Sequence, residues 1–297
     1  MKPPADLDRT AGLFMRHGTL WFESAFCRKR GCEALLFSNP VEEVVLESIS
    51  GIEAFFRTIE EKLDAGYYLA GWLDYEAGPG FERSLVNSCD GSRTPSPLAW
   101  FGVYREPEQF SPVEVEVLFS RRNTCFQDEQ EELSGLSFNL SSQEYSEKIR
   151  ALKDEIAAGN VYQVNFTGRY RFSFSGNPAA LFRSLRLEQP DSYTAFLNNG
   201  RHAILSFSPE LFFRRDSQGL VVRPMKGTSR RGGTPEEDRF LREGLSRDEK
   251  NRSENVMIVD LLRNDLARLM HQAGGGEVRV NSLFDVETYE SLLQMTS

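Results

Sequence analysis

The sequence predicts an α+β protein whose sheets are mostly antiparallel. Short segments rich in aromatic and β-branched residues are separated by turn residues, which is the pattern of paired strands. Helical stripes are few and do not alternate regularly with strands, so a parallel βαβ sheet is not indicated. The chain has 297 residues, enough for one large domain or two of ordinary size.

The first part of the chain combines one predicted helix with several strands. Apolar residues recur at spacings of three and four over residues 52–65, which predicts an amphipathic helix. Residues 67–78 and 97–104 are rich in aromatic and aliphatic side chains and predict buried strands. Residues 113–119, VEVEVLF, alternate strictly along the chain, so we expect a strand with one open face.

A run of charged residues at 128–132, DEQEE, is typical of a solvated linker. We therefore expect an N-terminal region at residues 1–127 and a second domain at residues 141–297. No repeat of the length used by solenoids or propellers is visible on either side.

The second part begins with a helix whose apolar stripe spans residues 142–157 and whose stop signal is Gly159 followed by Asn160. A hairpin turn is indicated at residues 198–200, Asn-Asn-Gly. The further strands expected are 161–174, 192–197, 202–216, 219–224 and 278–284. The further helices expected are 178–187, 237–247 and 248–270.

The overall composition excludes several classes of function. The 35 basic and 44 acidic residues give a net charge of −9, so we expect no nucleic-acid partner. A small anionic ligand is still compatible, because a pocket can be locally positive on an acidic protein. No apolar run of spanning length and no secretory signal occur, so we expect no membrane partner. The four cysteines form no CxxC pair, which favours reduced thiols and a cytoplasmic location.

The segment RPMKGTSRR contains a candidate nucleophile, Lys226. A lysine confined among apolar groups can lose its proton, and the neutral amine is then nucleophilic. Gly227 allows a ligand to approach the backbone closely, Thr228 offers a hydroxyl, and Arg230 and Arg231 offer anion contacts. Composition alone favours a second interpretation, a surface lysine beside a turn with two solvated arginines.

Two carboxylates are further candidates. Glu210, in SPELFF, lies among Phe207, Leu211 and Phe212, where an apolar environment would raise its pKa and suit a general acid. An outward-facing glutamate on an edge strand is equally compatible with the alternation. Glu254 lies at the start of the apolar stripe of the long helix, where it would ligate a hard cation or serve as a helix-dipole partner.

One polar strand face is a candidate ligand surface. Gln163, Asn165 and Thr167 in YQVNFT would lie on the same side of a strand. They would either be solvated or line a ligand cavity.

Five segments in a fixed order resemble the chorismate-utilising enzymes. They are YQVNFT, SFSPELFF, RPMKGT, DEKNRSENVMIVDLLRNDLARL and VNSLFDVETYESLLQMTS. WFESAF, AGWLDYEAG and PLAWFGVY are similar to the first domain of that family more loosely. The resemblance implies an antiparallel β-sandwich with flanking helices, like that of anthranilate synthase component I.

Two positions separate the reactions of this family. Anthranilate synthases carry alanine where this chain has Lys226, whereas aminodeoxychorismate synthases typically carry lysine. Isochorismate and salicylate synthases carry a water-activating lysine where this chain has Gln163, and an amide has no accessible pKa for that role. The resemblance therefore implies amination of chorismate at C4, in p-aminobenzoate and folate biosynthesis. The alternatives are anthranilate synthase component I and a non-catalytic remnant that binds tryptophan or a partner.

The resemblance also implies roles for individual residues. Lys226 would attack the substrate ring at C2, and Glu210 would protonate the leaving hydroxyl. The Gly227 amide and Thr228 would hold substrate carboxylates, and Mg²⁺ would be bound through Glu254. Ammonia would come from a separate glutamine amidotransferase subunit, because the chain has no Cys-His glutaminase pattern.

A tryptophan-type pocket is implied at Ser24 together with Ser192, Tyr193 and Thr194, where relatives hold a tryptophan molecule. Relatives often carry histidine at the position of Gln294. The chain ends inside a family motif, so we expect a C-terminally truncated component I, incomplete in its fold and inactive alone.

Overall fold

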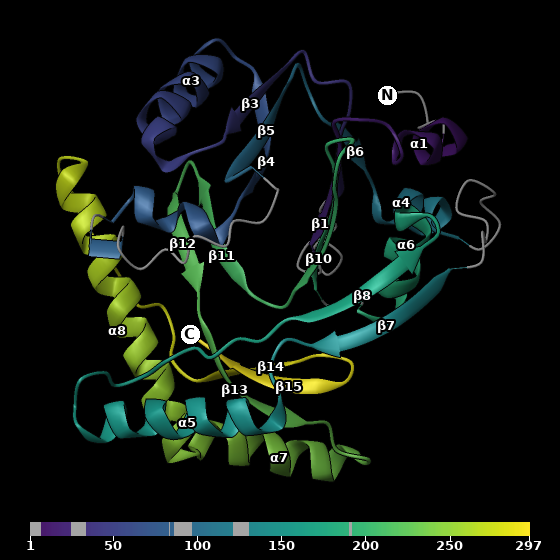
Figure 1. Ribbon diagram of the computed structural model, residues 1–297. Helices are drawn as coiled ribbons and strands as arrows, with labels where there is room; N and C mark the ends of the chain where they lie inside the picture. Colours follow the sequence, from purple (N-terminus) through teal and green to yellow (C-terminus); the bar gives the residue numbers. More distant parts are fainter. Residues whose placement is uncertain (1–6, 25–33, 83, 86–96, 121–130, 190–191) are drawn as a thin grey trace.

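Two antiparallel sheets stack face to face in the upper part of the molecule (Figure 1). The larger has the strand order β10-β9-β1-β2-β6, and the smaller has the order β3-β5-β4. The strands of the larger sheet are β1 Thr19–Ser24, β2 Ala34–Phe37, β6 Glu108–Phe110, β9 Tyr193–Asn198 and β10 Ala203–Ser208. Those of the smaller sheet are β3 Glu42–Leu46, β4 Tyr68–Leu73 and β5 Ala99–Tyr104. The computed structural model describes residues 7–24, 34–82, 84–85, 97–120, 131–189 and 192–297.

An apolar layer lies between the two sheets because side chains alternate along each strand. Leu20 of β1 and Leu197 of β9 belong to the same buried cluster as Trp100 of β5. The ring of Trp72 stacks on that of Trp100, with centroids 5.2 Å apart. The antiparallel β-sandwich expected from the sequence is therefore confirmed. β1 and β9 are neighbours in register, so the larger sheet joins segments from both parts of the chain.

Helices cover the outer faces of both sheets. The larger sheet is covered by α1 Leu7–Leu13, α4 Pro112–Leu118 and α6 Pro178–Glu188. Trp21 of β1 and Phe196 of β9 pack there against Phe182 of α6. The smaller sheet is covered by α3 Ile52–Asp64, with the short helices η1 Ile49–Gly51 and η2 Tyr75–Gly80 at its end. The sandwich thus has helices on both sides, as expected.

A buried ion pair joins α6 to β1. Arg186 donates from Nε and Nη2 to the two carboxylate oxygens of Glu23 at 2.7 and 2.9 Å. Both side chains are almost fully buried, Arg186 also contacts Glu116 at 3.3 Å, and its guanidinium lies over the Phe119 ring. Burial opposes the charge, but the hydrogen bonds and charge of Glu23 outweigh it and raise the pKa of Arg186. Arg186 therefore remains charged at neutral pH.

A third sheet, of order β13-β15-β14, lies in the lower part of the molecule with two helices. Its elements are β13 Met225–Arg230, β14 Asp285–Thr288, β15 Leu292–Thr296, α7 Pro235–Arg247 and α8 Glu249–Gln272. Leu245 of α7 packs against Leu293 and Met295, which project from one face of β15. The opposite face of this sheet carries polar residues and adjoins the candidate site.

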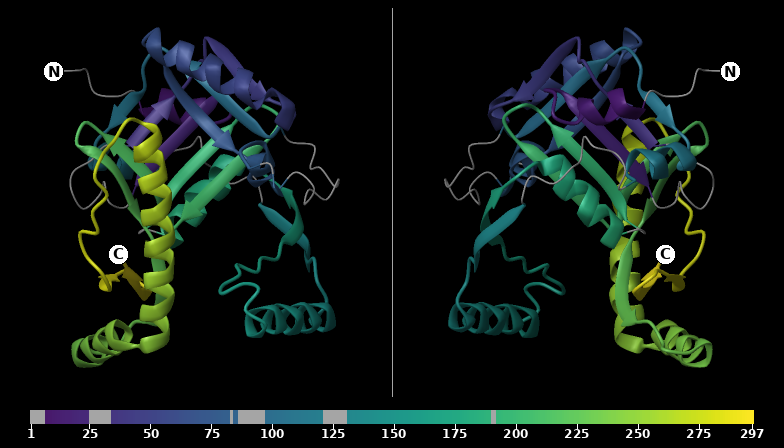
Figure 2. Two further views of the ribbon diagram at one scale, coloured as in Figure 1. Left: turned by 90° about the vertical axis from the view of Figure 1, so that its left-hand side faces the viewer. Right: turned by 90° about the vertical axis from the view of Figure 1, so that its right-hand side faces the viewer.

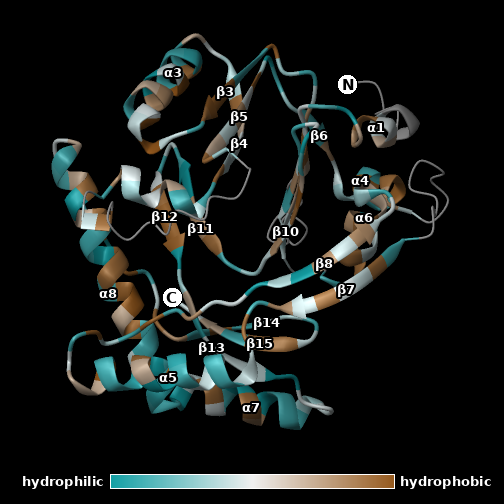
Figure 3. Ribbon diagram, in the orientation of Figure 1, coloured by the Kyte–Doolittle hydropathy of each residue, from teal (hydrophilic) through white to brown (hydrophobic). Residues whose placement is uncertain are grey.

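The unit formed by β7 Glu132–Phe138, α5 Ser142–Ala157 and β8 Tyr170–Ser175 contains no buried residue. Figure 2 shows it standing apart from α7 and α8. Figure 3 shows apolar residues along β7, and Leu133, Leu136 and Phe172 are more than half exposed. Within the described ranges, no helix has both the length and the apolar character needed to cross a bilayer.

Residues 113–119 were expected as a strand, and that expectation is wrong, because α4 occupies them. Ser111 caps the helix by accepting from the Glu114 N–H, while its own N–H donates to the Glu114 carboxylate. Pro112 follows the cap at the first helical position, where its fixed φ is favourable. The buried residues Val115 and Leu118 are three apart, so the helical period decides which side chains face the core.

Four other expected strands differ from the structure. Of residues 67–78, only 68–73 form a strand, β4, whose end residues Tyr68 and Leu73 are exposed, and η2 follows at Tyr75–Gly80. Residues 161–169 are irregular, and only residues 170–175 of that stretch form β8. Residues 202–216 are split at Pro209 into β10 and β11 Leu211–Asp216, because proline cannot donate to a ladder. Residues 278–284 are irregular, and β14 begins at Asp285. The helices expected near residues 52, 142, 178, 237 and 248 are all found.

Glu23→Gln should lower the free energy of unfolding by about 3 kcal/mol, because it removes the buried carboxylate that pairs with the Arg186 cation and leaves the more distant, exposed Glu116 carboxylate beside it. Urea denaturation measures the loss. The matched control is Asp260→Asn in the exposed Asp260–Arg263 pair, whose loss should stay below about 1 kcal/mol. Equal losses in the two variants would contradict a buried, charged pair.

Candidate functional site

Lys226 lies at an irregularity in the pairing of β13 with β15. The register shifts between Met225 and Thr228, so Lys226 and Gly227 occupy a bulge. A bulge re-aims the side chain that it carries. Lys226 as a whole residue is half-buried.

Gly227 is held against α8. Its φ is +91°, in the left-handed region that favours glycine. A Cβ atom on this residue would lie 3.0 Å from the Cβ and Cγ atoms of Asn251. Helix α8 therefore packs directly on the backbone beside Lys226, and the position requires a residue without a side chain.

Glu210 is held by a hydrogen bond to the backbone of Met225, the residue before Lys226. The Met225 N–H donates to Glu210 Oε1 at 2.9 Å. Glu210 lies in the break between β10 and β11, so a turn of the upper sheet contacts a strand of the lower one. The apolar surroundings expected for this carboxylate are not found, since Glu210 is exposed and Phe212 is 84% exposed.

A row of polar side chains crosses the lower sheet beside Lys226. Thr228 of β13 pairs with Gln294 of β15, and Gln294 pairs in turn with Glu287 of β14. Directly opposed residues project from the same face of a sheet, so these three side chains share the face opposite α7. Thr228 itself is exposed.

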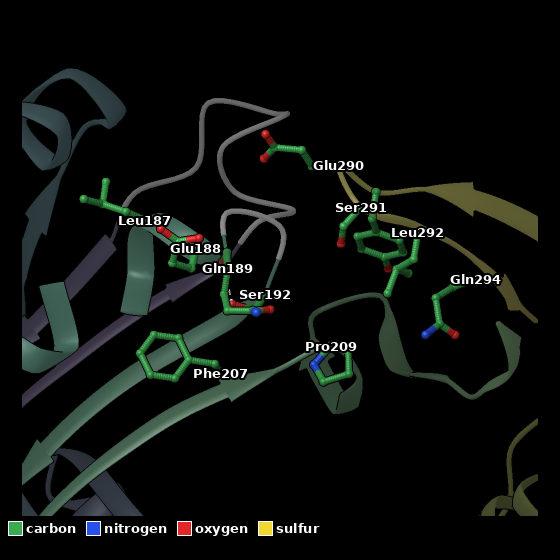
Figure 4. Close-up of a pocket in the computed structure, with 11 residues that line it drawn as sticks. Leu187, Glu188, Gln189, Ser192, Phe207, Pro209, Glu290, Ser291, Leu292 and Gln294 are labelled. Carbon is green, nitrogen blue, oxygen red and sulfur yellow. Dashed lines mark hydrogen bonds between the residues drawn. The ribbon is translucent and has the colours of Figure 1, made fainter. Parts of the chain in front are cut away.

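A cavity of about 410 Å³ adjoins this row (Figure 4). Its volume is in the range that accommodates one small molecule. Lys226, Glu210 and Thr228 are not part of its lining, which includes Pro209, the neighbour of Glu210, and Gln294, the partner of Thr228. Its lining consists of Leu187, Glu188, Gln189, Ser192, Phe207, Pro209, Tyr289, Glu290, Ser291, Leu292 and Gln294.

Glu254 lies on α8, three residues after Asn251. Its side chain is about one third exposed and lies 3.8 Å from Lys250. Across the described ranges, no group of three histidine, cysteine, aspartate or glutamate side chains is arranged to hold a metal ion. A single carboxylate does not complete a Mg²⁺ site, so the described residues alone do not fit a protein-only site for this ion.

Gln163 is not brought into the group around Lys226. It lies in the irregular segment between α5 and β8, and Figure 2 shows that unit apart from α7 and α8. The strand face expected for Gln163, Asn165 and Thr167 does not form, because these residues are outside β8.

The residues of the predicted tryptophan-type pocket are divided between two faces of the larger sheet. Ser24 lies opposite Tyr193 across β1 and β9, so these two share a face. Thr194 lies opposite Glu23, on the face that α6 covers. Ser192, next to Tyr193, lines the 410 Å³ cavity. The four residues are close in space, but only two of them share a face.

The two arginines expected to contact anions are engaged by α7 instead. Arg230 pairs with Glu237, and Arg231 donates to both oxygens of Asp238 at 2.7 and 3.0 Å. The hydrogen bond to Arg231 lowers the pKa of Asp238, so this pair stays ionised at neutral pH. Both guanidinium groups are thus already paired with carboxylates of α7.

Sequence reasoning missed Asn251, Arg223 and Glu287. Asn251 is one helical turn before Asn255, and this spacing places both on the α8 face toward β13. Glu287 and Tyr289 are two residues apart, which suggests a shared strand face, and the Tyr289 hydroxyl donates to Glu287 at 2.7 Å. The pairing of Arg223 with Glu287 has no local signal, because 64 residues separate them.

Comparisons with known proteins identify the family of the chain. The sequence profile described as chorismate binding enzyme matches residues 19–297. The chain belongs to the chorismate-binding enzyme family. The relatives carry two names, anthranilate synthase component 1 and aminodeoxychorismate synthase. Anthranilate synthase component 1 of Aquifex aeolicus is 37% identical over 159 residues, which are 54% of this chain and 32% of that protein. Aminodeoxychorismate synthase component 1 of Escherichia coli is 36% identical over 227 residues, 76% of this chain and 46% of that protein.

The fold is similar to that of solved family members. Anthranilate synthase component I of Streptococcus pneumoniae matches with a TM-score of 0.71 and 20% identity, over 89% of this chain and 68% of that one. The chain spans about a third of the length of the Aquifex relative and less than half of the Escherichia coli relative. The family is thus established, while relatives of both names match to a similar degree.

Gly227→Ala should destabilise the protein more than Gly274→Ala. The two glycines have nearly equal φ values, +91° and +92°, but only Gly227 faces neighbouring atoms within 4 Å. Both variants should lose about 1 kcal/mol to backbone strain, and Gly227→Ala should lose about 1–3 kcal/mol more through overpacking against Asn251. Chemical denaturation of both variants measures the difference. Identical losses would show that α8 does not pack on this backbone.

Proposed function

We propose that this chain serves in the amination of chorismate at C4, giving 4-amino-4-deoxychorismate. The observation that carries the proposal is the hydrogen bond from the Met225 N–H to Glu210, which holds a carboxylate beside the strand of Lys226. This contact joins the turn of Glu210 to the backbone one residue before Lys226, which supports a shared role for the two segments. Membership of the chorismate-binding family supports the substrate.

The first step forms a covalent intermediate on Lys226. Its neutral Nζ attacks ring carbon C2, the ring double bonds shift, and the C4–O bond breaks. Glu210 gives its proton to the departing hydroxyl, which leaves as water, because hydroxide is a poor leaving group. The half-buried position of Lys226 on a bulge supports a directed amine.

The second step transfers nitrogen. Ammonia attacks C4, the double bonds shift back, and the C2–N bond to Lys226 breaks, which returns the amine. Two easier substitutions thereby replace one difficult one. We propose that a glutamine amidotransferase subunit supplies the ammonia, and that Thr228 and the Gly227 amide hold substrate carboxylates.

Mg²⁺ is part of this proposal only through Glu254. The ion would neutralise a substrate carboxylate, and its other ligands would have to come from outside the described residues, because Glu254 supplies one carboxylate. No step above depends on the ion.

Anthranilate synthase component I is the second candidate. The Aquifex relative of that name, 37% identical over 159 residues, supports it. The lysine at position 226 favours aminodeoxychorismate formation, because a covalent route needs an amine at this place. The product therefore separates the two candidates.

We propose further that the isolated 297-residue chain does not turn over chorismate. Glu210 and Thr228 are exposed, and an open site leaves water in competition with ammonia and weakens the electrostatic interactions inside it. A steady-state assay with chorismate, an ammonium salt and Mg²⁺ should give no product. Aminodeoxychorismate formation would refute the inactivity, and anthranilate with pyruvate would favour the second candidate.

The nucleophile role is tested in an intact aminodeoxychorismate synthase relative. Chorismate without ammonia should leave an adduct on the lysine that aligns with Lys226, located by peptide mass spectrometry. Replacing that lysine by alanine should remove the adduct and lower product formation by at least about a hundredfold. The control replaces an exposed lysine that corresponds to Lys153 on α5. Full aminodeoxychorismate formation by the alanine variant would contradict the role.

A further inference from the structure

Two arginines on either side of Lys226 contact the same short segment of the lower sheet. Arg223 ends β12 Gly219–Arg223, three residues before Lys226. Its guanidinium donates to Glu287 Oε1, and both side chains are about one third exposed. Glu287 lies on β14, so this ion pair crosses from the strand that leads to Lys226 to the far edge of the three-stranded sheet.

Tyr289 extends this contact to the cavity. Its hydroxyl donates to the second oxygen of Glu287 at 2.7 Å, and its side chain belongs to the cavity lining. Burial, with the hydrogen bond and charge of Glu287, raises the pKa of Tyr289. The hydroxyl thus stays protonated and remains a donor near neutral pH.

Arg231 holds the same segment from the other side. It follows β13 directly, five residues after Lys226. Its Nη1 donates to the backbone carbonyls of Tyr289 and Glu290, while Asp238 of α7 fixes the rest of the guanidinium. Arg231 therefore fastens the turn between β14 and β15 to α7 and to the end of the Lys226 strand.

We propose that Arg223 and Arg231 are positioning residues that clamp the segment 287–290 to the strand of Lys226. Lys226 thus lies between two arginines that are both anchored to segment 287–290. The clamp fixes the distance between Lys226 and the cavity wall formed by Tyr289, Glu290 and Ser291. The catalytic purpose of the clamp rests on the proposed function of Lys226. Its mechanical effect on Lys226 does not.

Site-resolved labelling of lysines tests the clamp without requiring turnover. The intact chain is acetylated with trace acetic anhydride, and peptide mass spectrometry gives the rate at Lys226 relative to exposed Lys153. In Arg223→Met and in Arg231→Met, Lys226 should be freed from its half-buried position, and its relative rate should rise roughly threefold or more. Arg279→Met is the matched control, because it breaks the exposed Arg279–Glu277 pair and should leave the ratio unchanged.

Conservative variants separate positioning from general loosening. Arg223→Lys keeps the charge and should restore the ratio toward that of the unaltered chain. Glu287→Gln removes the ion pair with Arg223 by changing the carboxylate instead of the arginine. If the arginine variants do not fold, this variant should show the same rise in the relative rate at Lys226. A rise at all lysines together, or no change at Lys226, would overturn the proposal.

Protection by chorismate provides a separate result. If chorismate binds beside Lys226, it should slow acetylation of Lys226 in the unaltered chain and leave Lys153 unaffected. Failure of protection counts against the proposed function, whereas the effect of the arginine variants still decides the clamp. The two proposals therefore fail in different measurements.

Discussion

The ion pair between Glu23 and Arg186 fixes the geometry on which the candidate site depends. Arg186 is near the C-terminal end of α6, and the next three residues line the 410 Å³ cavity. Glu23 precedes Ser24 at the end of β1, beside Tyr193. Two charges can be buried here only because each satisfies the other with two hydrogen bonds. The pair therefore aligns one wall of the cavity with the end of the larger sheet.

The other wall belongs to the lower sheet, and a hydrogen bond joins this sheet to the upper one. The Glu210 carboxylate, in the break after β10, accepts from the backbone of β13. Proline at position 209 ends the ladder of β10 and allows the chain to turn toward that strand. The proline that interrupts the strand thus allows the contact between Glu210 and the backbone of β13, which joins the upper and lower sheets at the candidate site.

Local sequence patterns predicted the elements well where period and end signals agreed. Helix α5 ends just before Gly159, as its stop signal indicated, and the turn between β9 and β10 was found as expected. The alternation of residues 113–119 wrongly predicted a strand, because the capping box of Ser111 and Glu114 stabilises a helix and outweighs a period-two pattern. Contacts such as Glu23 with Arg186, 163 residues apart, have no local pattern and depend on how the sheet is ordered. Candidate residues were thus predictable individually, whereas their partners were not.

The segments that carried the family resemblance become neighbours in the fold, with one exception. SPELFF contacts RPMKGT through Glu210 and Met225, and α8 packs on the same segment through Asn251 and Gly227. The last segment pairs with it through Gln294 and Thr228. YQVNFT stays apart, in a unit with no buried residue in β7, α5 or β8. Four segments thus meet at one bulge, while the exposed position of the β7–α5–β8 unit accounts for the absence of Gln163 from this group.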